Sequence, residues 1–217
     1  MRAPDNDEGV GREPLCPSLA SPAQLRSHGR VRVLFLENHD SFSLNVVESL
    51  PVDRADVVLL PGGDVARDAG LLDGADLVVV GPGPTDPVRA GLVGVVQAVA
   101  QRGLPLLGIC LGHQALGLAF GAGLMRVPPV HGKRSTITFS ESRLFPGFVG
   151  RQTVMRYHSL ALSGIAAPLR LIAQTDDGIV MAIEHETLPM AGLQFHPDSF
   201  ASPCGKEMIA DFFRAVA

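Results

Sequence analysis

The sequence predicts an α/β protein built on an open, doubly wound, mostly parallel sheet with helices on both faces, plus antiparallel strands in its C-terminal half. Three observations support this fold class. Short apolar runs alternate with amphipathic segments between residues 31 and 120. These runs are apolar throughout, as in parallel strands that are covered on both faces. After residue 130 the runs partly alternate between polar and apolar residues, which is typical of antiparallel strands.

The first half contains four expected strands, each followed by a helix. The strands are residues 31–36, 56–60, 77–80 and 104–109. The expected helices are one capped by Asp40 or Ser41, a short one after residues 61–63, one at 87–101 capped by Asp86, and one at 112–120. We expect Val88 to lie on the apolar face of the third helix. Gly121 is placed to end the fourth.

The second half is expected to form strands at residues 134–139, 153–157, 169–175, 179–184 and 190–195, with a hairpin turn at 176–178. Residues 204–216 carry an apolar stripe at helical spacing and predict a closing helix. Residues 1–30 are rich in Pro, Ser, Gly and charge and predict a disordered tail. The folded domain therefore spans residues 31–217.

Composition excludes several function classes. The chain has 217 residues, 46% of them hydrophobic, and a formal net charge of -4, which gives no basic surface for nucleic acid. No apolar run approaches the ~18 residues that a transmembrane helix requires. The first thirty residues lack the apolar centre of a signal peptide. We therefore expect a cytoplasmic protein that binds neither nucleic acid nor membrane.

Cys110 is the candidate nucleophile. It follows the fourth expected strand and precedes a helix, with Gly108 and Gly112 two residues away on either side. Glycines at these positions let the backbone turn sharply and expose the side chain, as in the nucleophile elbow of hydrolases. A helix N-terminus favours the thiolate over the thiol. The alternative is a structural cysteine buried at a strand end.

His196 is the best candidate for the base that a cysteine nucleophile needs. It follows the last expected strand, and Asp198 stands two residues later, beyond Pro197. Residues two apart in an extended segment point to the same side, so the carboxylate could orient the imidazole. The alternative for this triplet is a solvated loop.

The oxyanion formed by nucleophilic attack requires hydrogen-bond donors. The backbone N–H of Leu111, at the start of a helix, is one natural donor. Gly83, after the third strand, could supply a second if its strand neighbours that of Cys110. Gly83 could equally be a simple turn glycine.

Metal binding has no support in the histidine or cysteine spacing. The seven histidines are scattered, and no H-x-x-x-H or C-x-x-C pair occurs. We expect polar loop or packing roles for five of them: His39, His113, His131, His158 and His185. We predict no metal site.

Several short motifs, in order, resemble one family. They are residues 108–114 (GICLGHQ), 37–42 (ENHDSF) followed by Asn45, 131–133 (HGK), 156–160 (RYHSL) and 194–197 (QFHP). From residue 31 to 216 the chain resembles class I glutamine amidotransferases, specifically the small subunits of anthranilate synthase and aminodeoxychorismate synthase.

The resemblance implies hydrolysis of L-glutamine through a glutamyl thioester on Cys110, with His196 as base and acid. It implies glutamine contacts from Gln114, from the backbone of Ser159 and Leu160, and from the loop of Gly83. Ammonia would pass to a separate synthase that aminates chorismate, within a heterodimer or heterotetramer. The resemblance implies no cofactor in this chain and magnesium in the partner. Residues 131–133 are a candidate part of the docking face.

Three positions depart from the family pattern. Asp198 stands where the family has glutamate, one methylene longer. Thr85 replaces the last glycine of a Pro-Gly-Pro-Gly loop, which would be strained if the position needs a positive φ. Residues 61–64 (PGGD) replace an Arg-Asn-Asp turn. These departures leave two alternatives open: a weakened or inactive docking subunit of the same fold, or an amidotransferase for a different acceptor.

Overall fold

The computed structural model describes residues 31–217, and the predicted tail at residues 1–30 lies outside them. The described residues form one nine-stranded sheet in the order β2-β1-β3-β4-β9-β8-β7-β5-β6. The strands are β1 (Val33–Glu37), β2 (Val57–Pro61), β3 (Leu77–Val80), β4 (Leu106–Ile109), β5 (Gly123–Phe139), β6 (Gly150–Ser163), β7 (Leu169–Thr175), β8 (Val180–His185) and β9 (Met190–Leu193). The helices are α1 (Ser43–Ser49), α2 (Gly62–Arg67), α3 (Leu92–Gln101), α4 (Leu111–Ala119) and α5 (Gly205–Val216), with short 3-10 turns η2 (Arg54–Asp56) and η3 (Ala69–Leu72).

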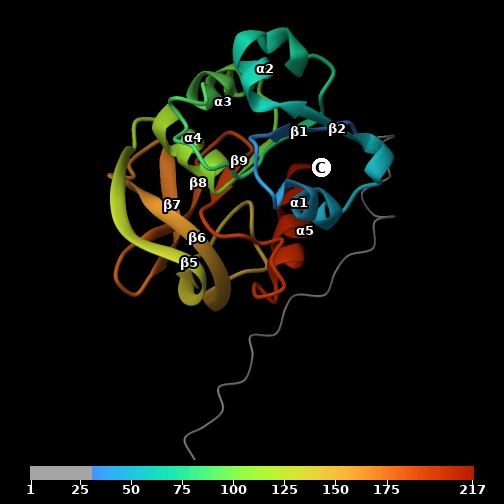
Figure 1. Ribbon diagram of the computed structural model, residues 1–217. Helices are drawn as coiled ribbons and strands as arrows, with labels where there is room; N and C mark the ends of the chain where they lie inside the picture. The colour runs from blue at the N-terminus through green and yellow to red at the C-terminus, as the bar shows by residue number, and fades with distance from the viewer. Residues whose placement is uncertain (1–30) are drawn as a thin grey trace, which may run out of the picture.

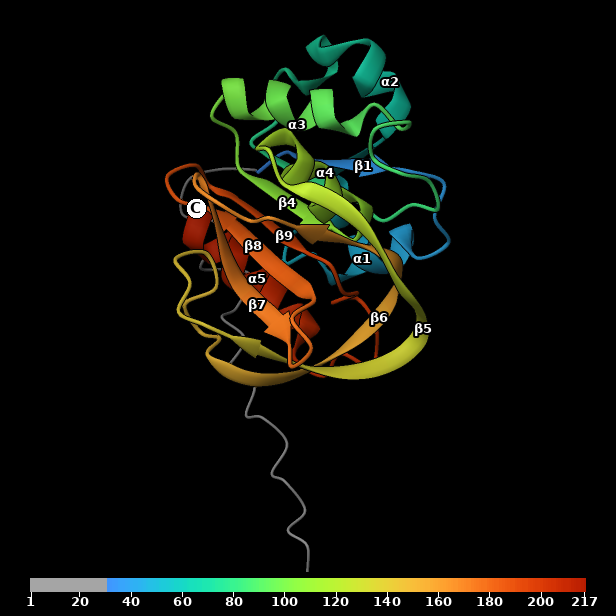
Figure 2. The same ribbon diagram turned by 90° about the vertical axis from the view of Figure 1, so that its left-hand side faces the viewer.

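Helices cover both faces of the parallel strands, which confirms the predicted fold class. Figures 1 and 2 show α2, α3 and α4 on one side of these strands and α1 and α5 on the other. In β1, Val33 and Phe35 belong to the core that includes α1 and α5, whereas Leu34 and Leu36 pack into the core of α2, α3 and α4. Burial of both faces explains why the first-half strands are apolar throughout.

The expected helix at residues 87–101 is shorter than predicted. The helix α3 begins only at Leu92, because Gly91 adopts the left-handed conformation with φ 71°. Asp86 caps a separate turn instead: its Oδ1 accepts hydrogen bonds from the backbone N–H groups of Val88 and Arg89. Val88 is 65% exposed, so its predicted place on the buried face is wrong.

The predicted cap of α1 is also wrong. The helix begins at Ser43 with Phe42 as its N-cap residue, and no side chain caps it. The Asp40 carboxylate accepts a hydrogen bond from the N–H of Phe42, 2.8 Å away, which orders the turn before the helix.

In the second half, β5 and β6 are much longer than expected, at 17 and 14 residues, and they pair as a long curved antiparallel ribbon (Figure 2). The predicted hairpin turn between β7 and β8 is confirmed, with Gly178 at φ 80°. The closing helix α5 is confirmed within one residue.

The strand β9 corrects the expected pairing of the second half. It pairs antiparallel with β8 but parallel with β4, so it joins the antiparallel part of the sheet to the parallel part. As a result, the segment after β9 leaves the sheet at the same edge as the segment after β4.

Neither helices nor side-chain clusters in residues 31–217 suggest a membrane span or a metal site. None of these helices has the length and apolar character required to cross a bilayer. The same residues contain no group of three or more His, Cys, Asp or Glu side chains arranged to hold a metal ion.

Candidate active site

The candidate site lies where three neighbouring parallel strands end. β3, β4 and β9 are adjacent in the sheet, and Gly83, Cys110 and His196 follow them in that order. Polar and reactive groups of open α/β sheets gather at this carboxyl edge. The structure therefore brings together three residues that are far apart in the sequence.

Cys110 sits on a strained turn between β4 and α4. Its φ of 52° and ψ of -96° are unusual for a residue with a side chain. The turn depends on small neighbours: a Cβ on Gly108 would lie 2.5 Å from Gly112, and one on Gly112 would lie 2.2 Å from the carbonyl oxygen of Val80. The backbone N–H of Cys110 donates to the carbonyl of Leu193 on β9 at 2.8 Å, which anchors the turn. This geometry supports an elbow, because a merely structural cysteine would not require such strain.

His196 is held rigidly beside Cys110. Its backbone N–H donates to the carbonyl of Met155 at 3.0 Å, and its own carbonyl accepts from the Ser202 hydroxyl at 2.7 Å. Its ring makes edge contacts with Phe42 and Tyr157, at centroid distances of 5.7 and 5.5 Å. The imidazole is therefore fixed from both backbone and ring sides.

The charges around His196 favour its protonated form. Burial by itself would lower the pKa of His196, but the contacts with Asp198 and Cys110 outweigh burial and raise this pKa to about 10. Imidazolium beside Cys110 stabilises a thiolate, which is the nucleophilic form of cysteine.

Asp198 faces His196 at a longer distance than a hydrogen bond. The separation between His196 Nδ1 and Asp198 Oδ1 is 3.5 Å, and the Asp198 side chain is 1% exposed. Neither carboxylate oxygen has a hydrogen-bond donor among the described residues. The expected same-side placement of the two residues is present, but the carboxylate contacts the imidazole as an ion pair.

A pocket of about 260 Å³ opens in front of Cys110. Its lining residues come from the loop after β3, from α4 and from the β5–β6 ribbon: Gly83, Pro84, Thr85, Cys110, Gln114, His131, Tyr157, His158, Ser159 and Leu160. A volume slightly below the range of about 300 to 1,000 Å³ for drug-sized ligands suits a ligand of amino-acid size. The pocket unites Cys110 with the residues whose glutamine contacts were predicted from Gln114, Ser159, Leu160 and Gly83.

Gly83 and Leu111, the two residues predicted to supply the oxyanion donors, pack against each other. A Cβ on Gly83 would be 2.6 Å from the Leu111 side chain and 2.9 Å from the carbonyl oxygen of Asn38. Gly83 therefore cannot be replaced without displacing its neighbours, and a simple turn does not explain that requirement.

Two histidines expected in loops or packing instead line the pocket. His131 and His158 come from β5 and β6. Burial, and after it the nearby Arg156 guanidinium, together lower the pKa of His158 to about 4. The neutral His158 ring donates from Nδ1 to the Leu160 carbonyl at 2.9 Å and accepts at Nε2 from Arg156 at 3.0 Å. The spacing of histidines along the chain carried no signal for either residue, but both stand in motifs of the family resemblance, at residues 131–133 and 156–160.

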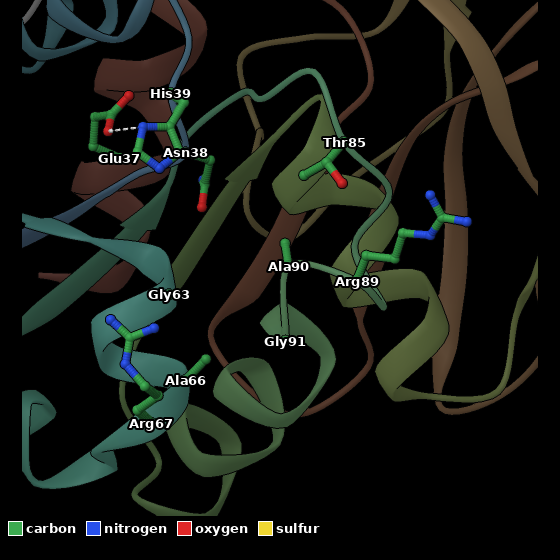
Figure 3. Close-up of a pocket in the computed structure, with 10 residues that line it drawn as sticks. All are labelled: Glu37, Asn38, His39, Gly63, Ala66, Arg67, Thr85, Arg89, Ala90 and Gly91. Atoms are coloured by element: carbon green, nitrogen blue, oxygen red, sulfur yellow. Dashed lines mark ion pairs between the residues drawn. The ribbon is translucent and has the colours of Figure 1, made fainter.

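A neighbouring pocket of about 350 Å³ lies at the ends of β1 and β2 (Figure 3). Its described lining includes no cysteine, and its two arginines, Arg67 and Arg89, already pair with Asp64 and Asp86. Thr85 borders both pockets. The cysteine pocket is therefore the better candidate for chemistry.

The other two departures noted in the sequence have a structural account. Among residues 31–217 only His39 and Cys110 combine a side chain with a positive φ, so Thr85 is not strained. Residues 61–64 contribute the end of β2 and the start of α2. Gly62 is required there, because a Cβ would lie 2.3 Å from the Asn38 amide oxygen.

This protein has an open α/β sheet with a cysteine on a sharp strand-to-helix turn, beside a buried histidine and carboxylate. These features place it among the α/β proteins with a cysteine nucleophile. Residues 34–216 match the family described as glutamine amidotransferase class-I. The chain belongs to the class I glutamine amidotransferase family.

Within this family, the chain is similar to proteins named for two synthases. The chain is 40% identical over 193 residues to anthranilate synthase component 2 of Mycobacterium tuberculosis, covering 84% of this chain and 81% of that protein. It is also 40% identical over 185 residues to aminodeoxychorismate synthase of Streptomyces griseus, but spans only 26% of that longer protein. A solved structure from Thermoplasma acidophilum, of a proposed subunit of GMP synthase, matches the fold with a TM-score of 0.76 at 22% identity, covering 87% of this chain and 95% of that one.

Proposed function

We propose that Cys110 and His196 hydrolyse the side-chain amide of L-glutamine. The Cys110 thiolate attacks the amide carbonyl, the C–N bond breaks, and His196 gives its proton to the departing ammonia. The product on the protein is a glutamyl thioester. His196 then takes a proton from water as the water oxygen attacks the thioester, which releases glutamate and restores the thiolate.

One observation carries this proposal: Cys110 stands on a strained elbow that lines an amino-acid-sized pocket and has a protonated histidine beside it. The backbone N–H groups of Leu111 and Gly83 would stabilise the oxyanion, and the packing of Gly83 against the Leu111 side chain places the two residues beside each other. Gln114, Ser159 and Leu160 would bind the substrate, since all three line the same pocket.

We further propose that the ammonia passes to a separate chorismate-aminating synthase. The names of the relatives at 40% identity support this, and most of the longer aminodeoxychorismate synthase relative lies outside the part that this chain matches. The bulge of β5 at residues 131–133 borders the site and would form part of the docking face. The cytoplasmic location remains a prediction.

The direct test measures glutamate release from glutamine by the purified chain, alone and with the chorismate-binding synthase of the same genome. The proposal predicts release that disappears in Cys110→Ala, while ammonium salts still support amination of chorismate. A wild-type chain without glutaminase activity, in a complex that uses ammonium normally, contradicts the proposal.

A second candidate is a docking subunit of the same fold with weakened or no glutaminase activity. The 3.5 Å separation between Asp198 and His196 favours it, because the carboxylate orients the imidazole less firmly than a hydrogen bond would. A third is an amidotransferase for another acceptor. Glutamate release in the direct test distinguishes the docking subunit from the proposed function, and the product formed with the synthase distinguishes the third candidate.

A further inference from the structure

Gln194 makes an unassigned contact with the candidate nucleophile. It directly follows β9, its side chain is fully buried, and its amide nitrogen donates to Cys110 Sγ at 3.6 Å. Buried polar side chains are almost always hydrogen-bonded, and here one partner is the sulfur itself. The contact therefore links a neutral, fully buried donor directly to the atom that would carry the nucleophilic charge.

Gln114 determines which end of the Gln194 amide faces the sulfur. The Gln114 amide nitrogen carries two hydrogens, and it donates to Gln194 Oε1 at 3.1 Å and to the Leu160 carbonyl at 3.2 Å. If the Gln194 amide were reversed, two NH₂ groups would face each other. Its oxygen therefore points to Gln114 and its N–H groups point to Cys110.

The hydrogen bonds beyond Leu160 also have a fixed donor and acceptor at each step. The Leu160 carbonyl also accepts from His158 Nδ1, and His158 Nε2 accepts from Arg156, which can only donate. Burial keeps His158 neutral, with a pKa of about 4, so both of these hydrogen bonds persist at neutral pH. The hydrogen bonds thus extend from a cationic side chain on β6 to the sulfur on the elbow.

We propose that Gln194 is a hydrogen-bond donor that stabilises the Cys110 thiolate, and that Gln114 is the positioning residue that orients it. A donor interacts more strongly with a charged acceptor than with a neutral one, so this contact favours thiolate over thiol. The Cys110 sulfur thus has two stabilising contacts, one with Gln194 and one with His196. The inference deepens the proposed glutaminase function and rests on Cys110 as its nucleophile.

The test measures alkylation of Cys110 by iodoacetamide from pH 5 to pH 10, followed by mass spectrometry of the Cys110 peptide. We compare the wild-type chain with Gln194→Met, which keeps the length of the side chain and removes the donor. The midpoint of the alkylation profile should rise by about one pH unit, because a lost donor to a charged group changes the thiolate equilibrium about tenfold or more. Gln152→Met, at a buried glutamine on β6 opposite Ile137, is the matched control and should leave the midpoint unchanged.

Gln194→Glu provides a second variant of nearly the same shape, in case the methionine variant does not fold. A carboxylate beside the sulfur repels the thiolate, so the midpoint should rise at least as much. A wild-type midpoint in either folded Gln194 variant overturns the inference. Because alkylation needs no glutamine, a shifted midpoint in a chain that releases no glutamate would support this inference and contradict the proposed function separately.

Discussion

The length of the Asp198 side chain should limit the rate of glutamate release. His196 Nδ1 and Asp198 Oδ1 are 3.5 Å apart, whereas N–H···O hydrogen bonds measure about 2.7 to 3.2 Å, so the gap is about 0.3 to 0.8 Å too long. Glutamate adds one C–C bond of about 1.5 Å, and rotation about the extra bond lets the carboxylate close this gap.

The expected magnitude follows from the size of the gap. A misplacement of about 1 Å can lower a rate about a hundredfold, so closing about half an ångström should increase the rate on the order of tenfold. We predict that Asp198→Glu raises kcat for glutamate release about tenfold and changes KM much less, because Asp198 does not line the glutamine pocket. Asp198→Asn, which keeps the shape but removes the charge, should lower kcat by about a hundredfold or more.

The assay is steady-state glutamate release at saturating glutamine, with the synthase partner present, on variants whose thermal unfolding matches the wild type. An unchanged or lower kcat in a folded Asp198→Glu variant would refute the reasoning and show that the site is adapted to aspartate. If Asp198→Asn retained the full rate, the carboxylate would have no part in orienting His196.

Three further predictions test the fold, its pH dependence and the docking face. Gly112→Ala should lower the free energy of unfolding, measured in urea, by about 1 to 3 kcal/mol, because the new methyl group would lie 2.2 Å from the carbonyl oxygen of Val80 at the end of β3. An unchanged free energy of unfolding would contradict the close packing of the turn at Cys110. Burial lowers the pKa of His113 to about 3 and that of His158 to about 4, so below the ordinary value of 6.5 the unfolded chain binds protons that the native chain does not. Stability should therefore fall as pH decreases from 6.5 to 4, by up to about 1.4 kcal/mol per pH unit for each histidine, and urea titrations that give constant stability would exclude this. Phe200, which is 93% exposed beside the site, should contact the synthase. Phe200→Asp should therefore reduce glutamine-dependent product formation at least tenfold, whereas Val149→Asp, at a 60% exposed residue next to the end of the β5–β6 ribbon where Phe139 pairs with Gly150, should not. Equal product formation by the two variants would place the docking surface elsewhere.

Local sequence signals were sufficient where the structure depends on neighbours along the chain. Uninterrupted apolar runs predicted the parallel strands because strands covered on both faces have no polar side. The glycines around Cys110 predicted the elbow because Gly108 and Gly112, which approach each other across it, lie within five residues. Gly91 was a local sign of a break in the chain that the predicted helix at residues 87–101 did not take into account. Its left-handed conformation explains why α3 begins only at Leu92.

Tertiary structure alone decided how the site is assembled. A short apolar run such as that of β9 does not specify its neighbours, so its parallel pairing with β4, which brings His196 to Cys110, is a property of the whole sheet. The Gln194 contact depends on Gln114, 80 residues away, and on a carbonyl of β6. The sequence determined which residue types could do chemistry at the strand ends. The fold determined their distances, because separations of half an ångström depend on packing between segments far apart in the chain.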